Sequence, residues 1–235
     1  GGKLSVKVSE TGTSYYNVFV DGKLHKVVKV CGTDTLIHLV SGIEKRIHSL
    51  KIQKRSEGEF GKTTVHQFVL SGSGRLAEEP AVRTRHIEFI GNSLTCGYGT
   101  DGKHRDEPFL VETENCNLTF ASMVARYYDA DYTLIAHSGR GAARNYGDSV
   151  RVSKVTMKDR MLNTFDEDLT HKWNFKEYRP DLVVINLGSN DFSTEPHPYK
   201  SEFTKAYKQI LAQLREHYGD IPILCIYPVA MQAPV

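Results

Sequence analysis

The first third of the chain consists of short runs in which apolar and polar residues alternate. A period of two puts the apolar side chains on one face of a strand, so each run predicts a half-buried β-strand. Asp21-Gly22 stands between two of these runs and is typical of a tight hairpin turn. Strands at this spacing predict an all-β sandwich or barrel domain over residues 1–83. The six runs cover residues 4–8, 15–20, 26–30, 35–40, 46–54 and 63–70.

After residue 83 the pattern changes to strands that alternate with helices. Apolar side chains recur every three or four positions within residues 118–128 and 203–214, which predicts an amphipathic helix in each segment. Repeated β–α units predict a parallel sheet with helices on its faces. The α/β domain is therefore expected to cover residues 84–235, after a linker at 78–81. The predicted strands are 86–90, 132–137, 182–187 and 221–228.

The composition excludes several classes of protein. Of the 235 residues, 40% are hydrophobic and 25% are charged, which is typical of a globular protein and not of a disordered one. Thirty basic and 28 acidic side chains leave a net charge of +2, too small to attract nucleic acid or an anionic membrane. No apolar run reaches the ~18–20 residues that a membrane-spanning helix needs. We therefore expect neither nucleic acid nor a membrane as a partner.

The sequence also lacks the patterns that bind metals or phosphates. Its cysteines stand at positions 31, 96, 116 and 225 without a Cys-x-x-Cys pair, which predicts buried thiols and neither a zinc site nor a disulfide scaffold. There is no His-Glu cluster with metal spacing and no phosphate-binding loop. We expect no cofactor and no metal. The charged residues of 101–114 predict a solvated loop.

Three polar clusters follow three of the predicted strands of the α/β domain. They are Gly91-Asn-Ser-Leu-Thr-Cys-Gly97, Ser138-Gly-Arg-Gly141 and Gly188-Ser-Asn-Asp191. Taken singly, the first could be a strand-to-helix cap and the third an ordinary turn. Because the carboxyl ends of parallel strands meet at one edge of a sheet, the three clusters are expected to converge there. This convergence predicts a functional site.

These clusters resemble the blocks of a known family. Ile90-Gly-Asn-Ser, Gly139-Arg-Gly and Gly188-x-Asn-Asp look like blocks I, II and III of the SGNH hydrolases. The longer phrases around them, together with Tyr15-Tyr-Asn-Val-Phe-Val-Asp-Gly22 and Lys54-Arg-Ser-Glu-Gly58, resemble carbohydrate esterase family 2. That resemblance implies a flavodoxin-like, three-layer α/β hydrolase domain behind a jelly-roll domain. It also implies a serine esterase.

The resemblance assigns a role to several residues. Ser93 would be the nucleophile, and the oxyanion would be bound by the amides of Ser93 and Gly139 and by the side chain of Asn190. Asn92 replaces the aspartate that is commoner in SGNH enzymes and is interpreted as a local hydrogen-bonding residue. The candidate substrate-binding residues are Tyr98, Arg140 and Trp173.

The family's catalytic histidine is missing from this sequence. In other members of the family this histidine lies in an Asp-x-x-His block after the last strand of the sheet. No such block occurs near Val235 in this sequence. His137 adjoins block II and His197 follows block III, but neither stands at the matching position. We therefore expect the catalytic histidine to lie outside this chain, and the chain to be truncated at both ends. A further N-terminal strand is expected to complete the sandwich.

The predicted function is the removal of O-acetyl groups from plant polysaccharides, such as xylan or glucomannan, through an acetyl-serine intermediate. By resemblance, such an enzyme would be secreted or periplasmic. Two alternatives remain open. The β-domain could be a carbohydrate-binding module beside a degenerate hydrolase, or the enzyme could be a general SGNH lipase or thioesterase. Activity on long-chain esters would favour the lipase.

Overall fold

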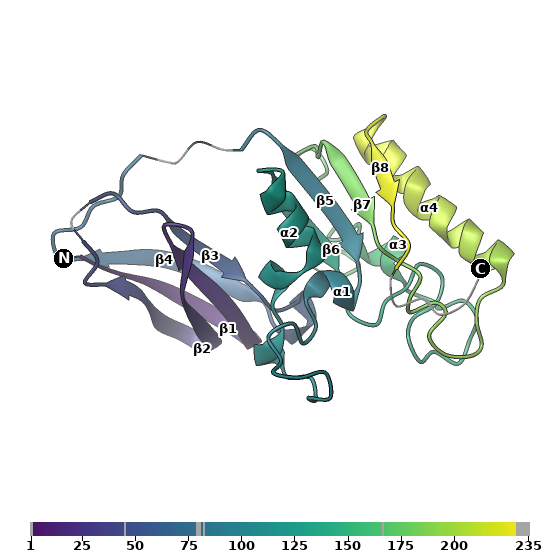
Figure 1. Cartoon of the computed structure of the whole chain (residues 1–235), viewed down its shortest axis with the longest axis horizontal. Coiled ribbons are helices and arrows are strands. Elements are labelled where there is room, and N and C mark those ends of the chain that lie inside the picture. The colour runs from purple at the N-terminus through teal and green to yellow at the C-terminus, as the bar shows by residue number, and fades with distance from the viewer. Residues whose placement is uncertain (1, 45, 79–80, 82, 166, 229–235) are drawn as a thin grey trace. The chain divides into compact units, whose positions relative to one another are not determined.

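The computed structural model describes residues 2–44, 46–78, 81, 83–165 and 167–228. The chain divides into two compact units (Figure 1). The N-terminal unit comprises residues 1–82 and 101–114, and the C-terminal unit comprises residues 83–100 and 115–235. Residues 79 and 80 of the predicted linker lie outside the described residues. Each unit has its own sheet and its own hydrophobic core.

The N-terminal unit contains a four-stranded antiparallel sheet built around β1 (Lys3–Val20). Strand β2 (Lys23–Ser41) pairs with β1 along its length. On the other edge of β1, β4 (Thr63–Ser71) pairs with the first half and β3 (Leu50–Lys54) pairs with the second half. Two 3-10 turns, Gly58–Phe60 and Val111–Thr113, complete the regular structure of this unit. The β-rich N-terminal domain predicted from the alternating pattern is confirmed.

The number of strands differs from the prediction, because the six short runs form four strands. The first two runs both lie in β1, and the next two both lie in β2. The register between β1 and β2 shifts between Val8 and Glu10 and again between Glu10 and Thr13. Such bulges accommodate extra residues while the strand stays in the sheet. The polar residues between the runs therefore mark bulges, and sequence alternation alone does not separate a bulge from a turn.

The predicted hairpin at Asp21-Gly22 is present. Val20 pairs with Lys23, so the loop has two residues, and both have positive φ, 50° for Asp21 and 76° for Gly22. This is the backbone of a type I′ turn, whose twist matches that of the two strands.

Apolar side chains from β1 and β2 form the hydrophobic core of the N-terminal unit. They are Val6, Val8, Val18, Val30 and Leu39.

The C-terminal unit contains a parallel sheet in the order β6–β5–β7–β8. The strands are β5 (His86–Gly91), β6 (Asp131–Ala136), β7 (Leu182–Ile185) and β8 (Ile223–Cys225). The helices are α1 (Ser93–Cys96), α2 (Phe120–Tyr127), α3 (Met157–Arg160) and α4 (Lys200–Tyr218), with a 3-10 turn at Cys116–Leu118. The predicted α/β domain with a parallel sheet is confirmed.

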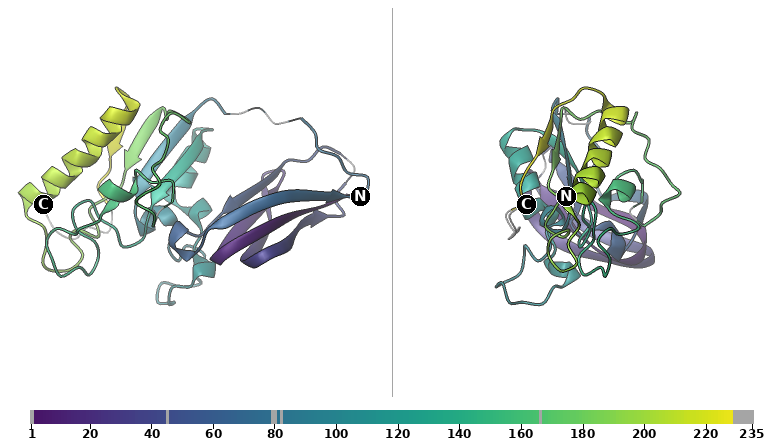
Figure 2. Two further views of the ribbon diagram at one scale, coloured as in Figure 1. Left: turned by 180° about the vertical axis from the view of Figure 1, so that it is seen from behind. Right: turned by 90° about the vertical axis from the view of Figure 1, so that its right-hand side faces the viewer.

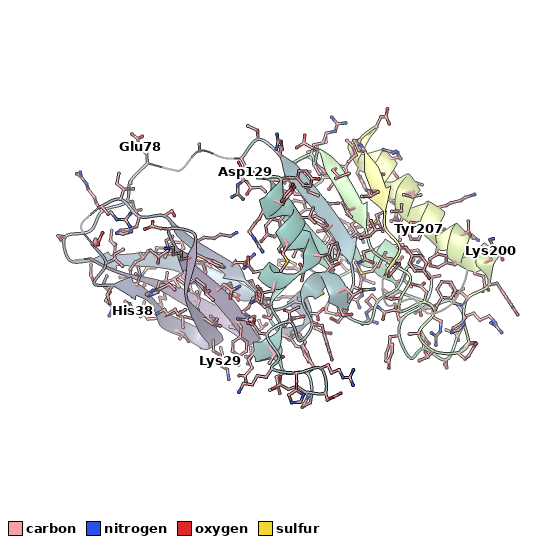
Figure 3. The ribbon with its side chains drawn as sticks, in the orientation of Figure 1. Lys29, His38, Glu78, Asp129, Lys200 and Tyr207 are labelled. Atoms are coloured by element: carbon pink, nitrogen blue, oxygen red, sulfur yellow. The ribbon has the colours of Figure 1, made fainter. Side chains whose placement is uncertain are left out.

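Helices cover both faces of this sheet, as Figure 2 shows. Ala121 and Ala125 of α2 pack against Phe89 of β5 and other residues of one face. Ile210 and Leu214 of α4 pack against the opposite face; Figure 3 labels Lys200, where this helix begins, and Tyr207 in its second turn. Because both faces are buried, the central strand β7 is apolar throughout, as expected for a parallel strand between two helical layers.

Glu114 is buried, although the sequence predicted that residues 101–114 form a solvated loop. Glu114 is fully buried, and its Oε2 accepts the backbone N–H of Glu57 at 2.9 Å. Burial, followed by the nearby charges of Glu57 and Glu59, raises the pKa of Glu114 to about 9. Most of the loop is exposed, but its last residue is part of the interior.

Glu114 is expected to make the stability of the chain depend on pH. An unfolded glutamate loses its proton near pH ~4.3, whereas the buried Glu114 keeps it up to about pH 9. Between these values the folded state holds the extra proton, so the free energy of unfolding falls as the pH rises. Calorimetric unfolding between pH 5 and 9 should show this fall, and Glu114→Gln should reduce it. Glu112→Gln, which changes an exposed carboxylate of the same loop, is the control. Equal slopes for Glu114→Gln and the unmodified chain would contradict the assignment.

Candidate active site

The three polar clusters of the sequence lie at one edge of the parallel sheet. They follow β5, β6 and β7, which are neighbours in the order β6–β5–β7. A pocket of about 340 Å³ opens between the loops after β5 and β7 and the loop that contains Tyr146. None of its lining residues is a histidine, cysteine or carboxylate, the side chains that most often hold metal ions. The lining residues are Ser93, Leu94, Tyr146, Ser189, Asn190, Phe192 and Ser193.

Ser93 begins α1, directly after β5. The side chain of Asn92 caps this short helix, because its Oδ1 accepts the backbone N–H of Leu94 at 3.2 Å. The Nδ2 of Asn92 donates to Ser189 Oγ at 2.9 Å, and this bond ties the loop after β5 to the loop after β7. Asn92 is fully buried and Ser93 is half-buried. The interpretation of Asn92 as a local hydrogen-bonding residue agrees with these contacts.

Asn190 lies against the backbone of the loop after β6. Its Nδ2 donates to the carbonyl oxygen of Arg140 at 2.8 Å. A side-chain amide has two N–H donors, so Asn190, which lines the pocket, has the capacity to donate to a bound group as well. Gly139, the neighbour of Arg140, has a φ of +75°, and its carbonyl accepts the N–H of Tyr146 at 2.8 Å. The side chain of Asn190 thus contacts the loop that contains Gly139, but Gly139 itself is not among the residues that line the pocket.

A buried carboxylate fixes the two loops to each other. The side chain of Asp191 accepts the backbone N–H groups of Ala142, Ala143 and Arg144 at 3.0, 2.6 and 2.9 Å. Residue 141 must be glycine, because a Cβ there would collide with this carboxylate and with the carbonyl of Arg144. Burial raises the pKa of Asp191, and the three N–H donors oppose that rise.

Arg144 is a structural residue and does not line the pocket. It is fully buried, and its guanidinium donates to the carbonyl oxygens of Val150 at 3.0 Å and Glu195 at 3.3 Å. It also donates to the carbonyl of Asp148 and to Thr194 Oγ1. One side chain therefore holds two surface loops beside the pocket.

The three candidate substrate-binding residues lie outside the pocket lining. Tyr98 is 49% exposed, and its N–H donates to the carbonyl of Ser93 at 3.1 Å. Arg140 is half-buried, and its carbonyl receives Asn190. The ring of Trp173 lies 5.9 Å from that of Tyr178, whose hydroxyl donates to Glu88 in β5. The assignment of these three side chains to substrate binding stays a prediction.

The two histidines considered from the sequence also lie outside the lining. His137 is buried, and its Nδ1 lies 3.8 Å from a carboxylate oxygen of Glu167. His197 has its ring 5.8 Å from that of Phe192, edge to face, and its Nδ1 lies 3.4 Å from Glu195. The described lining of the pocket therefore offers Ser93 no imidazole.

Sequence reasoning had not singled out Tyr146 and Phe192, which give the pocket its aromatic side chains. Tyr146 is 63% exposed, and Phe192 is half-buried. Both follow predicted polar clusters closely in the chain, Phe192 by one residue and Tyr146 by five. Their positions shortly after the clusters are the signal in the sequence that marks both residues.

The fold and the pocket together define a class of protein. A serine at the turn after one parallel strand, an asparagine amide after a neighbouring strand and a glycine-rich loop after a third are the parts of an SGNH-type hydrolase. The chain belongs to the GDSL-like lipase/acylhydrolase family, whose profile matches residues 89–235. Residues 1–80 match the N-terminal domain of carbohydrate esterase family 2. The resemblance drawn from the sequence is confirmed.

Individual relatives agree with this assignment. The cellulase/esterase CelE of Acetivibrio thermocellus is 36% identical over 225 residues, which are 96% of this chain and 27% of that protein. An acetylxylan esterase/glucomannan deacetylase of Cellvibrio japonicus is 32% identical over 197 residues, 83% of this chain and 52% of that protein. The structure of a family two carbohydrate esterase from Clostridium thermocellum, in complex with cellohexaose, superimposes with a TM-score of 0.90 at 35% identity, covering 97% of this chain and 68% of that one.

This chain thus spans about a quarter of the length of CelE and about half of the length of the Cellvibrio japonicus enzyme.

Within the described ranges, none of the helices combines the length and the apolar character that crossing a membrane requires.

Asp191→Asn is expected to destabilise the chain by about 2–5 kcal/mol, because an amide in place of the carboxylate leaves buried N–H donors without acceptors. Urea unfolding measures this change. Asp129→Asn is the matched control: Asp129 (Figure 3) is 83% exposed, and its φ of 49° suits asparagine, so a change within ~0.5 kcal/mol is expected. Equal effects of the two variants would show that the carboxylate does not hold the loops.

Proposed function

We propose that the chain is the catalytic part of a serine esterase that removes O-acetyl groups from plant polysaccharides. One observation carries the proposal: Ser93 and Asn190 line the same pocket, at the edge of the sheet where three strands end. Asn190 also contacts the backbone next to Gly139. The proposed nucleophile and one proposed oxyanion donor therefore line one small pocket, and another proposed donor, Gly139, belongs to the loop that Asn190 contacts.

The proposed reaction has two steps. Ser93 Oγ attacks the acetyl carbonyl carbon while a base takes its proton, and the negative charge on the carbonyl oxygen is bound by the amides of Ser93 and Gly139 and by Asn190 Nδ2. The bond between the acetyl carbon and the sugar oxygen breaks, and that oxygen receives the proton. Water then hydrolyses the acetyl-serine by the same route and releases acetate.

We propose that a histidine outside residues 1–235 supplies the base. This follows the family resemblance, and it is supported by the seven lining residues, none of which can take a proton from Ser93 at neutral pH. A serine hydroxyl without such a base is a poor nucleophile. The natural protein that carries this chain is therefore the material for each kinetic experiment.

The acetyl group and the polysaccharide are proposed from the pocket and from the relatives. Four of the seven lining side chains are polar, and the volume of about 340 Å³ is near the lower limit for ligand pockets, which suits a short acyl group better than a fatty acid. Curated relatives are named as acetylxylan esterases and glucomannan deacetylases. Because such substrates lie outside the cytoplasm, the protein is proposed to be secreted or periplasmic.

Tyr98, Arg140 and Trp173 are the proposed sugar contacts. The boundary between the two domains is proposed at residue 83.

Ser93→Ala is expected to abolish turnover of 4-nitrophenyl acetate and of acetylated xylan, because the hydroxyl is the proposed acyl acceptor. Steady-state rates measure the effect. Ser201→Ala, at an exposed position of α4, is the control and should keep the unmodified rate. Full activity of Ser93→Ala would refute the esterase mechanism. Faster hydrolysis of 4-nitrophenyl octanoate than of the acetate would favour a lipase.

Asn190→Ala is expected to lower kcat by ~10²–10³ while KM changes little, because its amide binds an oxygen that is negative only in the transition state. The two constants are measured with 4-nitrophenyl acetate at saturating and at low concentrations. A rise of KM with an unchanged kcat would instead assign Asn190 to the binding of the ground-state substrate.

A further inference from the structure

A loop that leaves the C-terminal unit directly after α1 is built into the N-terminal unit. Residues 101–114 connect α1 to the segment before α2, yet they cluster with residues 1–82. Phe109 of this loop stacks on Phe60, with ring centroids 5.8 Å apart. The hydroxyl of Tyr15 lies 3.4 Å from a carboxylate oxygen of Glu112. The loop therefore depends on the N-terminal sheet for its conformation.

The strongest of these contacts is made by Arg55, which follows β3 and is 2% exposed. Its Nε donates to the carbonyl of Glu114 at 2.7 Å, and one of its terminal nitrogens donates to the carbonyl of Glu112 at 3.1 Å. The same nitrogen forms an ion pair with the carboxylate of Asp101. Arg55 thus binds both ends of the loop, residue 101 and residue 114.

A second set of bonds joins the ends of the loop to α1. The carbonyl of Gly97, which ends α1, accepts the N–H of Thr100 at 3.1 Å and that of Asn115 at 3.0 Å. Thr100 Oγ1 also donates to the carbonyls of Gly97 and Asn115. Residues 100 and 115 are the immediate neighbours of residues 101 and 114, so the loop closes on the last turn of α1.

Helix α1 has only four residues, and Ser93 is the first of them. Helix formation is cooperative, and a single turn is not stable by itself in water. The N–H groups of Gly97 and Tyr98 both donate to the carbonyl of Ser93, at 3.0 and 3.1 Å. The conformation at Ser93 therefore depends on what holds Gly97, and Gly97 is held by the ends of the loop.

From these contacts we infer that Arg55 is a positioning residue for Ser93, and that the N-terminal unit holds the nucleophile turn in its active geometry through the loop 101–114. Arg55 is not among the residues that line the pocket. It acts through Asp101 and Glu114 on the two ends of the loop, and through Thr100 and Asn115 on α1. The inference rests on the proposed role of Ser93, and it gives the N-terminal unit a part in the reaction.

The test replaces Arg55 in the natural protein and measures the number of active sites separately from the kcat per site. Arg55→Met keeps the length of the side chain but removes its five donors. A fluorophosphonate that reacts covalently with the active serine titrates the sites. A positioning role predicts a full number of sites, a kcat per site lowered by ~10-fold or more and a KM for 4-nitrophenyl acetate that changes little.

Three further variants sharpen the result. Arg55→Lys keeps the charge for Asp101 but cannot reach all the carbonyls, so it should recover part of kcat. Asp101→Asn weakens the same anchor from a partly exposed position and should lower kcat in the same direction, even where Arg55→Met does not fold. Arg46→Met is the matched control, because Arg46 belongs to the same unit, is exposed and pairs with Asp21 and Glu44.

The outcomes separate this inference from the proposed function. Fewer titratable sites with an unmodified kcat per site would mean that Arg55 only stabilises the fold, and would overturn the inference. An equal fall of kcat in Arg46→Met would overturn it as well. If Ser93→Ala keeps its activity, the proposed function itself fails. If Ser93→Ala is inactive while Arg55→Met and Asp101→Asn turn over normally per site, only the positioning role fails.

Discussion

The carboxylate of Asp191 is the constraint on which the rest of the pocket depends. It is fully buried and binds three successive backbone N–H groups of the loop after β6. An uncompensated charge at this depth would be very unfavourable, so the carboxylate needs these N–H donors. The position of the carboxylate therefore fixes the position of the loop after β6. Asn190, the preceding residue, then meets the carbonyl of Arg140. The side chain of Asn190, a proposed oxyanion donor, is thereby tied to the loop that contains Gly139, and electrostatic stabilisation of a transition state requires such a fixed donor.

The turn that carries Ser93, the proposed nucleophile, is constrained from two directions. Within the C-terminal unit, Asn92 caps α1 and binds Ser189, so that the loops after β5 and β7 keep their spacing. Beyond Gly97 the chain enters the N-terminal unit, where Arg55 holds both ends of the excursion. A four-residue helix could not keep its geometry alone. These contacts are the basis of the proposed contribution of the β-rich unit to catalysis through α1.

The match between prediction and structure varies with the physical origin of each feature. The parallel sheet and its two helical layers were predictable, because Val183–Ile185 and the helical spacing of residues such as Ala121, Ala125 and Ile210 reflect burial on two faces. The strand count of the N-terminal unit was not predictable. A bulge near Glu10 and a turn leave the same polar interruption in the sequence, and only pairing with β2 distinguishes them.

The sequence by itself determined the family, the parallel sheet and the three clusters that contain Ser93, Gly139 and Asn190, because these depend on local patterns and on the rule that parallel strands end at one edge. Tertiary structure alone decided the partners of the buried charges. Neither the bonds of Asp191 to residues 142–144 nor those of Arg55 to residues 101–114 follow from local pattern, because the partners are 46–59 positions apart in the chain. Such distant pairs are set by how the loops fold together, and they hold the site in place.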